Sequence, residues 1–170
     1  MRCPGCGRDN IEGIDACENC GMDLAGLDLP AAGSGFRGHM LGDRLGDLAL
    51  PRAVEIDVTA TVAEAIAAMR RQGCGCVLVL RDGKLAGIFN ERHVLTRILR
   101  PGLDPAKTSM AEVMSPDPVR LSPLDPPAHA VHCMVAHGYR HLAVVEDERI
   151  LGYVSVREIL GYIAGLEAQY

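Results

Sequence analysis

The chain has 170 residues, of which 48% are apolar, enough for one compact domain or a compact module with a small appendage; a wholly disordered chain is excluded. Its 17 Lys and Arg are outnumbered by 22 Asp and Glu, and the net charge of −5 excludes an overall basic surface for a nucleic-acid backbone. Aromatic residues make up 4%, too few for base-stacking platforms. The longest apolar run, at 73–80, is strand-sized, and the first residues lack the apolar stretch of a secretory signal. We therefore expect a cytoplasmic protein.

Four of the seven cysteines form two Cys-x-x-Cys pairs near the N-terminus. A Cys-x-x-Cys turn places two sulfurs on the same side of a tight loop, as tetrahedral Zn²⁺ requires, and four thiolates leave no position open for catalysis. In a reducing compartment a metal explains such spacing better than disulfides do. Segment 1–24 is too short to bury a core, so the metal would stabilise its fold. The predicted ligands are Cys3, Cys6, Cys17 and Cys20.

The two knuckles, Cys-Pro-Gly-Cys-Gly and Cys-Glu-Asn-Cys-Gly, resemble those of the zinc-ribbon family. This resemblance implies one structural Zn²⁺ per chain, while iron in a rubredoxin-like centre and four ordinary thiols remain the alternatives. Residues 1–24 carry two arginines against five acidic residues, a net charge of −3 before the metal–thiolate centre adds about −2. Because phosphate backbones would repel such a segment, we expect it to contact a protein. The following residues, 25–45, are Gly-rich without a sustained period and predict a flexible linker.

The rest of the chain repeats itself at a spacing of 65 residues. Eleven of the 45 positions in 54–98 are identical to their counterparts without a gap, where chance gives roughly three or four. The identical pairs are Val54/Val119, Ala63/Ala128, Ala65/Ala130, Met69/Met134, Gly73/Gly138, Val79/Val144, Asp82/Asp147, Gly87/Gly152, Arg92/Arg157, Leu95/Leu160 and Ile98/Ile163.

Each copy is predicted to fold in the order β-α-β-β-α, with an amphipathic first helix. The expected elements of the first copy are strand 54–56, helix 61–72, strands 77–80 and 85–89, and helix 91–99. Those of the second copy are strand 119–121, helix 126–137, strands 142–145 and 150–154, and helix 156–164. One copy is too small to bury its sheet alone. We therefore expect an α+β pair, with the first repeat at 46–105 and the second at 106–170.

Several blocks of this repeat resemble CBS domains. They are 87–93 (Gly-Ile-Phe-Asn-Glu-Arg-His), 152–158 (Gly-Tyr-Val-Ser-Val-Arg-Glu), 138–145 (Gly-Tyr-Arg-His-Leu-Ala-Val-Val) and the junction 112–116 (Glu-Val-Met-Ser-Pro). The resemblance implies a tandem pair about a pseudo-twofold axis, with clefts for adenosine-containing ligands such as AMP, ADP, ATP or S-adenosylmethionine. It also implies regulation of a partner protein, pairing of two chains into a homodimer, and no chemistry of the module's own.

The family's cleft pattern is Gly, two apolar residues, Ser or Thr, two residues, then Asp. Its carboxylate accepts hydrogen bonds from both ribose hydroxyls, and its hydroxyl residue holds phosphate. In the second copy these positions hold Ser155 and Glu158, whereas the first copy has Asn90 and His93, which makes its cleft doubtful for ribose. The second cleft is therefore the expected site, with Ser155 and Glu158 as its centre and Arg157, Arg140 and His141 against phosphate.

Simpler explanations exist for the same residues. Ser155 is also a suitable N-cap with Glu158 at N3, and each arginine is equally explained as a solvated charge. In the first helix of the second copy, the polar positions are expected to face outward, either as a solvated or dimer-contact face or as a second metal site; they are His129, His132, Cys133 and His137. Cys74 and Cys76 are expected to be small core residues, with a redox pair as the alternative.

No catalytic motif is present, so the sequence indicates a non-enzymatic regulator with a zinc ribbon and a nucleotide-sensing pair. Two other functions remain open at this point. The ribbon could contact DNA or RNA while the pair only dimerises the chain, or the pair could be a scaffold with both clefts empty.

Overall fold

The structure is a computed structural model of the whole chain, and it describes residues 3, 5–11, 14–21, 23–24 and 36–167. It separates into two compact units, residues 1–39 and residues 40–170. No helix within the described ranges is both long and apolar enough to cross a membrane. Most of the predicted linker, 25–35, lies outside the described residues. Its last part differs from the prediction, because helix α1 spans Phe36–Gly42 and Leu45 is fully buried.

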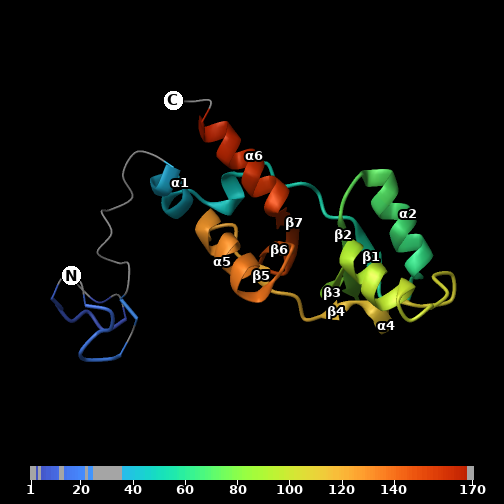
Figure 1. The fold of residues 1–170 in the computed structure, drawn as a ribbon, viewed down its shortest axis with the longest axis horizontal. Coiled ribbons are helices and arrows are strands. Elements are labelled where there is room, and N and C mark those ends of the chain that lie inside the picture. The colour runs from blue at the N-terminus through green and yellow to red at the C-terminus, as the bar shows by residue number, and fades with distance from the viewer. Residues whose placement is uncertain (1–2, 4, 12–13, 22, 25–35, 168–170) are drawn as a thin grey trace. The chain divides into compact units, whose positions relative to one another are not determined.

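The first repeat begins with β1 (Glu55–Asp57), α2 (Val62–Gln72), β2 (Cys76–Arg81) and β3 (Lys84–Asn90), labelled in Figure 1. β1 runs parallel to β2, and β3 runs antiparallel to it. Helix α2 begins at a capping box between Thr61 and Glu64 and ends at Gly73, whose φ of 62° is the left-handed conformation that glycine adopts easily. The predicted order of elements is thus confirmed, with strand ends displaced by one residue.

The last helix of the first repeat differs from the prediction of one α-helix at 91–99. A short α3 (Glu91–His93) continues as a π-helical segment, η2 (Val94–Leu99). Segments of this kind are rare and often occur at functional sites. The repeat-related element α6 (Val156–Glu167) is a regular α-helix, so the two copies differ in backbone at this position.

The second repeat contains β5 (Arg120–Leu121), α5 (Pro127–His137), β6 (His141–Glu146) and β7 (Arg149–Ser155), followed by α6. Its sheet has the order β5-β6-β7, with a parallel and then an antiparallel pairing. The prediction that the polar positions of α5 face outward is wrong for Cys133, which is 7% exposed and belongs to the second core. Cys133 lies three residues after the buried Ala130 on the edge of the apolar stripe, where a small sulfur side chain packs readily.

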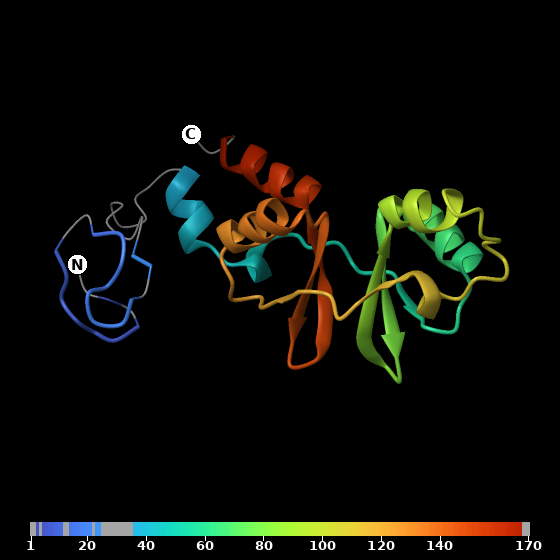
Figure 2. The ribbon, with the colours of Figure 1, turned by 60° about the horizontal axis from the view of Figure 1, so that its bottom comes forward.

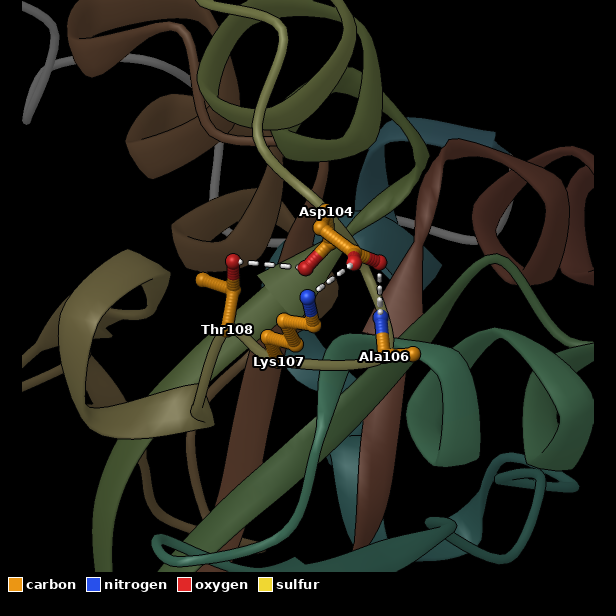
Figure 3. A network of polar contacts seen from close by, with 4 residues as sticks. All are labelled: Asp104, Ala106, Lys107 and Thr108. Carbon is orange, nitrogen blue, oxygen red and sulfur yellow. Dashed lines mark hydrogen bonds and ion pairs between the residues drawn. The ribbon is translucent and has the colours of Figure 1, made fainter.

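The connection between the repeats is anchored to the start of α2. Asp104 accepts hydrogen bonds from the Ala106 N–H (3.0 Å) and the Thr108 hydroxyl (2.8 Å), and its carboxylate lies 3.7 Å from the Lys107 ammonium (Figure 3). The Thr108 carbonyl in turn accepts from the Val62 N–H at 2.9 Å. The first turn of a helix has no internal partner for its N–H groups, and this loop supplies one.

Each repeat carries the leading segment of the other. Helix α4 (Met110–Val113) and β4 (Ser115–Pro116) precede β5, the first strand of the second repeat's sheet, yet α4 packs in the first core and β4 pairs with β3. Conversely, η1 (Leu45–Asp47) precedes β1, the first strand of the first repeat's sheet, yet Leu45 is buried in the second core. Chain order therefore does not decide which core these segments join, and sequence reasoning missed this exchange.

The glycine that both copies share lies where these leading segments cross. Pro116 is paired with Gly87, and a Cβ on Gly87 would collide with the Met114 side chain. In the other copy, a Cβ on Gly152 would lie 2.5 Å from the Pro51 carbonyl oxygen. At Gly152, only a residue without a side chain permits this close approach of two backbones.

The two sheets pack face to face. Figure 2 shows the β2–β3 and β6–β7 hairpins next to one another, with the helices of each repeat on the outer sides. One buried cluster holds side chains from both hairpins: Cys76, Leu78, Leu85, Ile88, Ala143 and Tyr153. The expectation that Cys76 is a core residue is confirmed, and burial raises the pKa of its thiol. The repeats therefore form one module with three apolar clusters, one per helix layer and one between the sheets.

Gly152→Ala is expected to lower the free energy of unfolding by about 1–3 kcal/mol, because the new Cβ meets backbone that cannot move independently. The control is Gly161→Ala in α6, where a Cβ meets nothing within 4 Å. Alanine favours helix there, so this variant should be as stable as the parent or up to about 1 kcal/mol more stable. Urea denaturation followed by circular dichroism measures both. Equal effects of the two substitutions would contradict the crossing-segment explanation.

Candidate functional site

The four N-terminal cysteines lie together. Their sulfurs are all within 4.8 Å of one another, with 3.6 Å between Cys3 and Cys20 and 3.6 Å between Cys6 and Cys17. Zn–S bonds of about 2.3 Å in a tetrahedron put sulfurs about 3.8 Å apart, so the cluster fits a metal of that geometry. Within the described residues, no other group of three or more His, Cys, Asp or Glu side chains meets at such distances. The histidines of α5 are therefore not gathered into a second cluster.

Both Cys-x-x-Cys turns close in the same way. The Gly7 N–H donates to the Cys3 carbonyl and the Gly21 N–H to the Cys17 carbonyl, each at 2.8 Å. Gly7 and Gly21 have φ of 73° and 70°, a conformation that glycine adopts easily and that lets the loop turn back after each knuckle. Two such turns bring four sulfurs to a common centre.

Hydrogen bonds to sulfur favour the thiolate form that a metal needs. The backbone N–H of Cys20 is the largest influence on Cys17 and lowers the pKa of its thiol to about 6. The Asn19 side chain, followed by the backbone at Arg8, lowers the pKa of Cys6. A soft, four-thiolate donor set suits zinc, and it suits iron as well. The residues present therefore fit the expected metal.

Two clefts lie between the repeats. The first-copy cleft has a volume of about 700 Å³ and is bounded by the end of β3, α3, η2, and residues 115–119 and 137–142. The second-copy cleft has a volume of about 430 Å³ and is bounded by the end of β7, the start of α6 and parts of the first repeat. Arg140 and His141 line both clefts, so the two are neighbours.

All five cleft residues expected from the sequence line the second-copy cleft, namely Arg140, His141, Ser155, Arg157 and Glu158. The structure adds Glu91 and Gly75 from the first repeat and Tyr153 from β7, which sequence reasoning missed. Tyr153 lies in the block 152–158, two residues before Ser155, so this block could have indicated it. Nothing in the sequence indicated that Glu91 would cross to the other copy's cleft.

Glu158 caps its own helix. One carboxylate oxygen, Oε2, accepts from the Ser155 N–H at 2.8 Å and from the Ser155 hydroxyl, and the Ser155 Oγ accepts from the Arg157 N–H at 3.2 Å. The capping explanation is therefore correct. It leaves the other oxygen, Oε1, without a hydrogen bond in the described part of the chain, so capping does not prevent a second role.

His141 is held between the clefts with one nitrogen unpaired. Its Nδ1 is buried and has no hydrogen-bond partner among the described residues, and its ring meets Tyr153 edge-on at 5.7 Å between centroids. A Cβ on Gly75 would lie 2.9 Å from His141 Nε2, so glycine makes room for the imidazole. Burial is the main cause that lowers the pKa of His141. An unpaired buried nitrogen at a cleft wall is a candidate ligand contact.

The first-copy cleft contains a connected polar network. The Asn90 N–H donates to His93 Nδ1 (3.3 Å), and His93 Nε2 lies 3.3 Å from Ser115 Oγ. Arg97 donates to Ser115 Oγ (2.9 Å) and to the Val113 carbonyl (2.7 Å). Burial, then the nearby arginines, lower the pKa of His93 to about 4, so the ring is neutral at pH 7. A neutral imidazole lacks the paired acceptors that a carboxylate offers to ribose.

Comparison with known proteins identifies the pair. The CBS domain family model matches residues 45–100 and 110–165, and the chain belongs to this family. The four-cysteine segment lies outside both matched ranges. CBS pairs are regulatory modules, so the coarse function of residues 45–165 follows from this membership.

Among relatives, the meiotically up-regulated gene 70 protein of Schizosaccharomyces pombe is 36% identical over 97 residues, which cover 56% of this chain and 13% of that protein. The chain spans between 13% and 49% of the length of the first three curated relatives. Among solved structures, a conserved Pyrococcus horikoshii protein has a TM-score of 0.66 at 18% identity, covering 73% of this chain and 92% of that one. A Pyrobaculum aerophilum CBS-domain protein, solved in complex with AMP, has a TM-score of 0.63 at 23% identity and covers 72% and 98%.

Proposed function

We propose that the second-copy cleft binds an adenosine-containing ligand (AMP, ADP, ATP or S-adenosylmethionine) and that this binding regulates a partner protein. The observation that carries the proposal is that all five cleft residues expected from the sequence gather on one hollow. Its volume of about 430 Å³ lies within the usual range of small-molecule sites. The AMP complex of the Pyrobaculum relative supports the ligand class.

The chemistry of the cleft suits a ribose phosphate. Glu158 Oε1 has no partner in the described part of the chain and would accept a ribose hydroxyl while Oε2 continues to cap α6. Arg157 and Arg140 would pair with phosphate, and His141 Nδ1 would contribute a neutral hydrogen bond. Because both repeats line the cleft, a ligand would shift their relative arrangement by its differential affinity for each state.

Isothermal titration calorimetry with the four ligands tests this function. We expect saturable binding with a micromolar dissociation constant, weakened about tenfold or more by Glu158→Gln, which keeps a capping oxygen but removes the charge. The matched control is Glu146→Gln at the exposed end of β6, which should bind as the parent does. Absence of binding to all four ligands would contradict the sensor function and favour a scaffold with empty clefts.

We propose further that Cys3, Cys6, Cys17 and Cys20 bind one structural Zn²⁺. The matching turns and the 3.6 Å sulfur separations support this ligand set. Among the described residues of this unit, only Cys3, Cys17 and Leu24 form its buried cluster. The bound metal would therefore stabilise its fold. The net charge of −3 in residues 1–24 supports a protein partner for this unit over nucleic acid, and a cytoplasmic location suits thiolates that must stay reduced.

Inductively coupled plasma mass spectrometry should find about one zinc per chain. The double variant Cys3→Ser/Cys20→Ser removes two of the four thiolates and should reduce the zinc content to near zero. Cys74→Ser, which changes a half-buried cysteine far from the knuckles in sequence, is the control and should keep the metal. Iron in place of zinc, or zinc retained by the double variant, would contradict the proposal.

We propose that two chains pair through the exposed apolar side chains of η2 and α6. Leu95 and Leu160 are identical residues at repeat-related positions and are 61% and 60% exposed, and Leu99 and Val156 beside them are 63% and 52% exposed. Apolar residues repeated on the surface of both copies favour a self-complementary contact.

Multi-angle light scattering should give twice the chain mass for the parent. Leu160→Glu places a charge in the proposed contact and should give a monomer with unchanged helix content. Val135→Glu changes another exposed apolar residue, on α5, and should remain a dimer. A monomeric parent, or the reverse pattern in the variants, would overturn the proposed dimer contact.

A further inference from the structure

The two clefts differ sharply in charge. The first-copy cleft is lined by Arg92, Arg97 and Arg140 against one carboxylate, Asp117, a formal charge of +2 when its histidines are not counted. In the second-copy cleft, two carboxylates balance two arginines. The described residues provide no ion pair for any of the three arginines of the first-copy cleft. Unpaired like charges along one hollow attract a multivalent anion.

Part of this basic set is already held in place. Arg97 is fixed on the cleft wall by its bonds to the Val113 carbonyl and Ser115 Oγ. The repeat-related residue in α6 is Tyr162, whose hydroxyl donates instead to Asp43 at 2.7 Å. The arginine therefore belongs to the first copy alone. A guanidinium held in advance binds an anion with less loss of side-chain entropy than a free one.

Ser115 has a proton to give to a ligand. His93 Nδ1 accepts from the Asn90 N–H, which assigns the ring proton to Nε2, and Nε2 then donates to Ser115 Oγ. Arg97 donates to the same oxygen. With both lone pairs of the oxygen used as acceptors, the hydroxyl proton is free to donate toward the cleft.

Acceptors for a ribose are scarce in the same cleft. The Asn90 side-chain oxygen already accepts from the His93 N–H at 3.2 Å, and the His93 ring is used on both nitrogens. Apart from the exposed carboxylate of Asp117, the first-copy cleft thus offers mainly cationic and hydroxyl donors, whereas the second-copy cleft contains Glu91 and the free Oε1 of Glu158. Its volume of about 700 Å³ exceeds the need of a single phosphate.

We propose that the first-copy cleft binds an oligophosphate group through Arg92, Arg97 and Arg140, with Ser115 as a hydroxyl donor and no requirement for a nucleoside. The ligand chemistry is a di- or triphosphate chain, either free or carried by a nucleotide. The site is separate from the adenosine site proposed above but shares the Arg140 wall with it. Occupation of one cleft therefore places charge beside the other.

Calorimetric titration of the zinc-loaded full chain with tripolyphosphate, without magnesium, tests the site. We expect saturable binding, weakened about tenfold or more by Arg92→Gln and several-fold by Ser115→Ala. Arg92 is exposed, and its side chain makes no hydrogen bond or ion pair with the described residues, so its variant should remain folded. Arg71→Gln, an exposed arginine on α2 outside both clefts, is the charge-matched control and should bind as the parent does.

Further titrations separate the sources and the two proposals. If tripolyphosphate competes with part of the ATP binding, the ligand of this cleft is the phosphate group of a nucleotide. If tripolyphosphate binds without such competition, the ligand is a free oligophosphate. Glu158→Gln should weaken nucleotide binding and leave tripolyphosphate binding unchanged. If tripolyphosphate gives no binding heat, the oligophosphate site is overturned and the adenosine site stands. The same holds if the heat is equal in the parent and in Arg92→Gln, which is the result that extraction of zinc by the phosphate would give. If tripolyphosphate binds but no nucleotide binding depends on Glu158, the adenosine site is overturned and the oligophosphate site stands.

Discussion

The reciprocal exchange of leading segments is the constraint on which the module depends. Residues before the first strand of each repeat pack into the core of the other, and they cross its third strand at a glycine, Gly87 in one copy and Gly152 in the other. Neither repeat is complete alone, because each core contains residues from the segment that leads into the other repeat. The exchange also fixes the clefts, since residues 115–119 of a leading segment form one wall of the larger hollow.

The same scaffold carries two unlike sites because a few substitutions differ between related positions. Ser155 and Glu158 correspond to Asn90 and His93, and Tyr162 corresponds to Arg97. Gly75 corresponds to Arg140; both residues line the second-copy cleft, and Arg140 also lines the first-copy cleft. His141 borders both clefts, and its Nδ1 is buried without a partner among the described residues.

The four-cysteine unit is stabilised in a different way from the repeats. Its described core is two cysteines and one leucine, with Ile14 packed beside them, which is too little apolar surface to hold a fold alone. The glycines after each knuckle and the N–H groups directed at sulfur prepare four thiolates for a cation. The repeats, in contrast, rely on three apolar clusters and need no metal for their packing.

The sequence by itself determined the cysteine turns and the repeat with its β-α-β-β-α order, because these depend on local spacing or on a comparison of the chain with itself. The five residues of the second-copy cleft were indicated by the resemblance of the second copy to the CBS pattern. Tertiary structure alone decided the exchange of leading segments, the π-helical turn at Val94–Leu99, the burial of Cys133, and the meeting of Arg97 with Ser115. Such contacts join residues far apart in the chain. Spacing cannot determine them, because which segments meet depends on how both cores fill together.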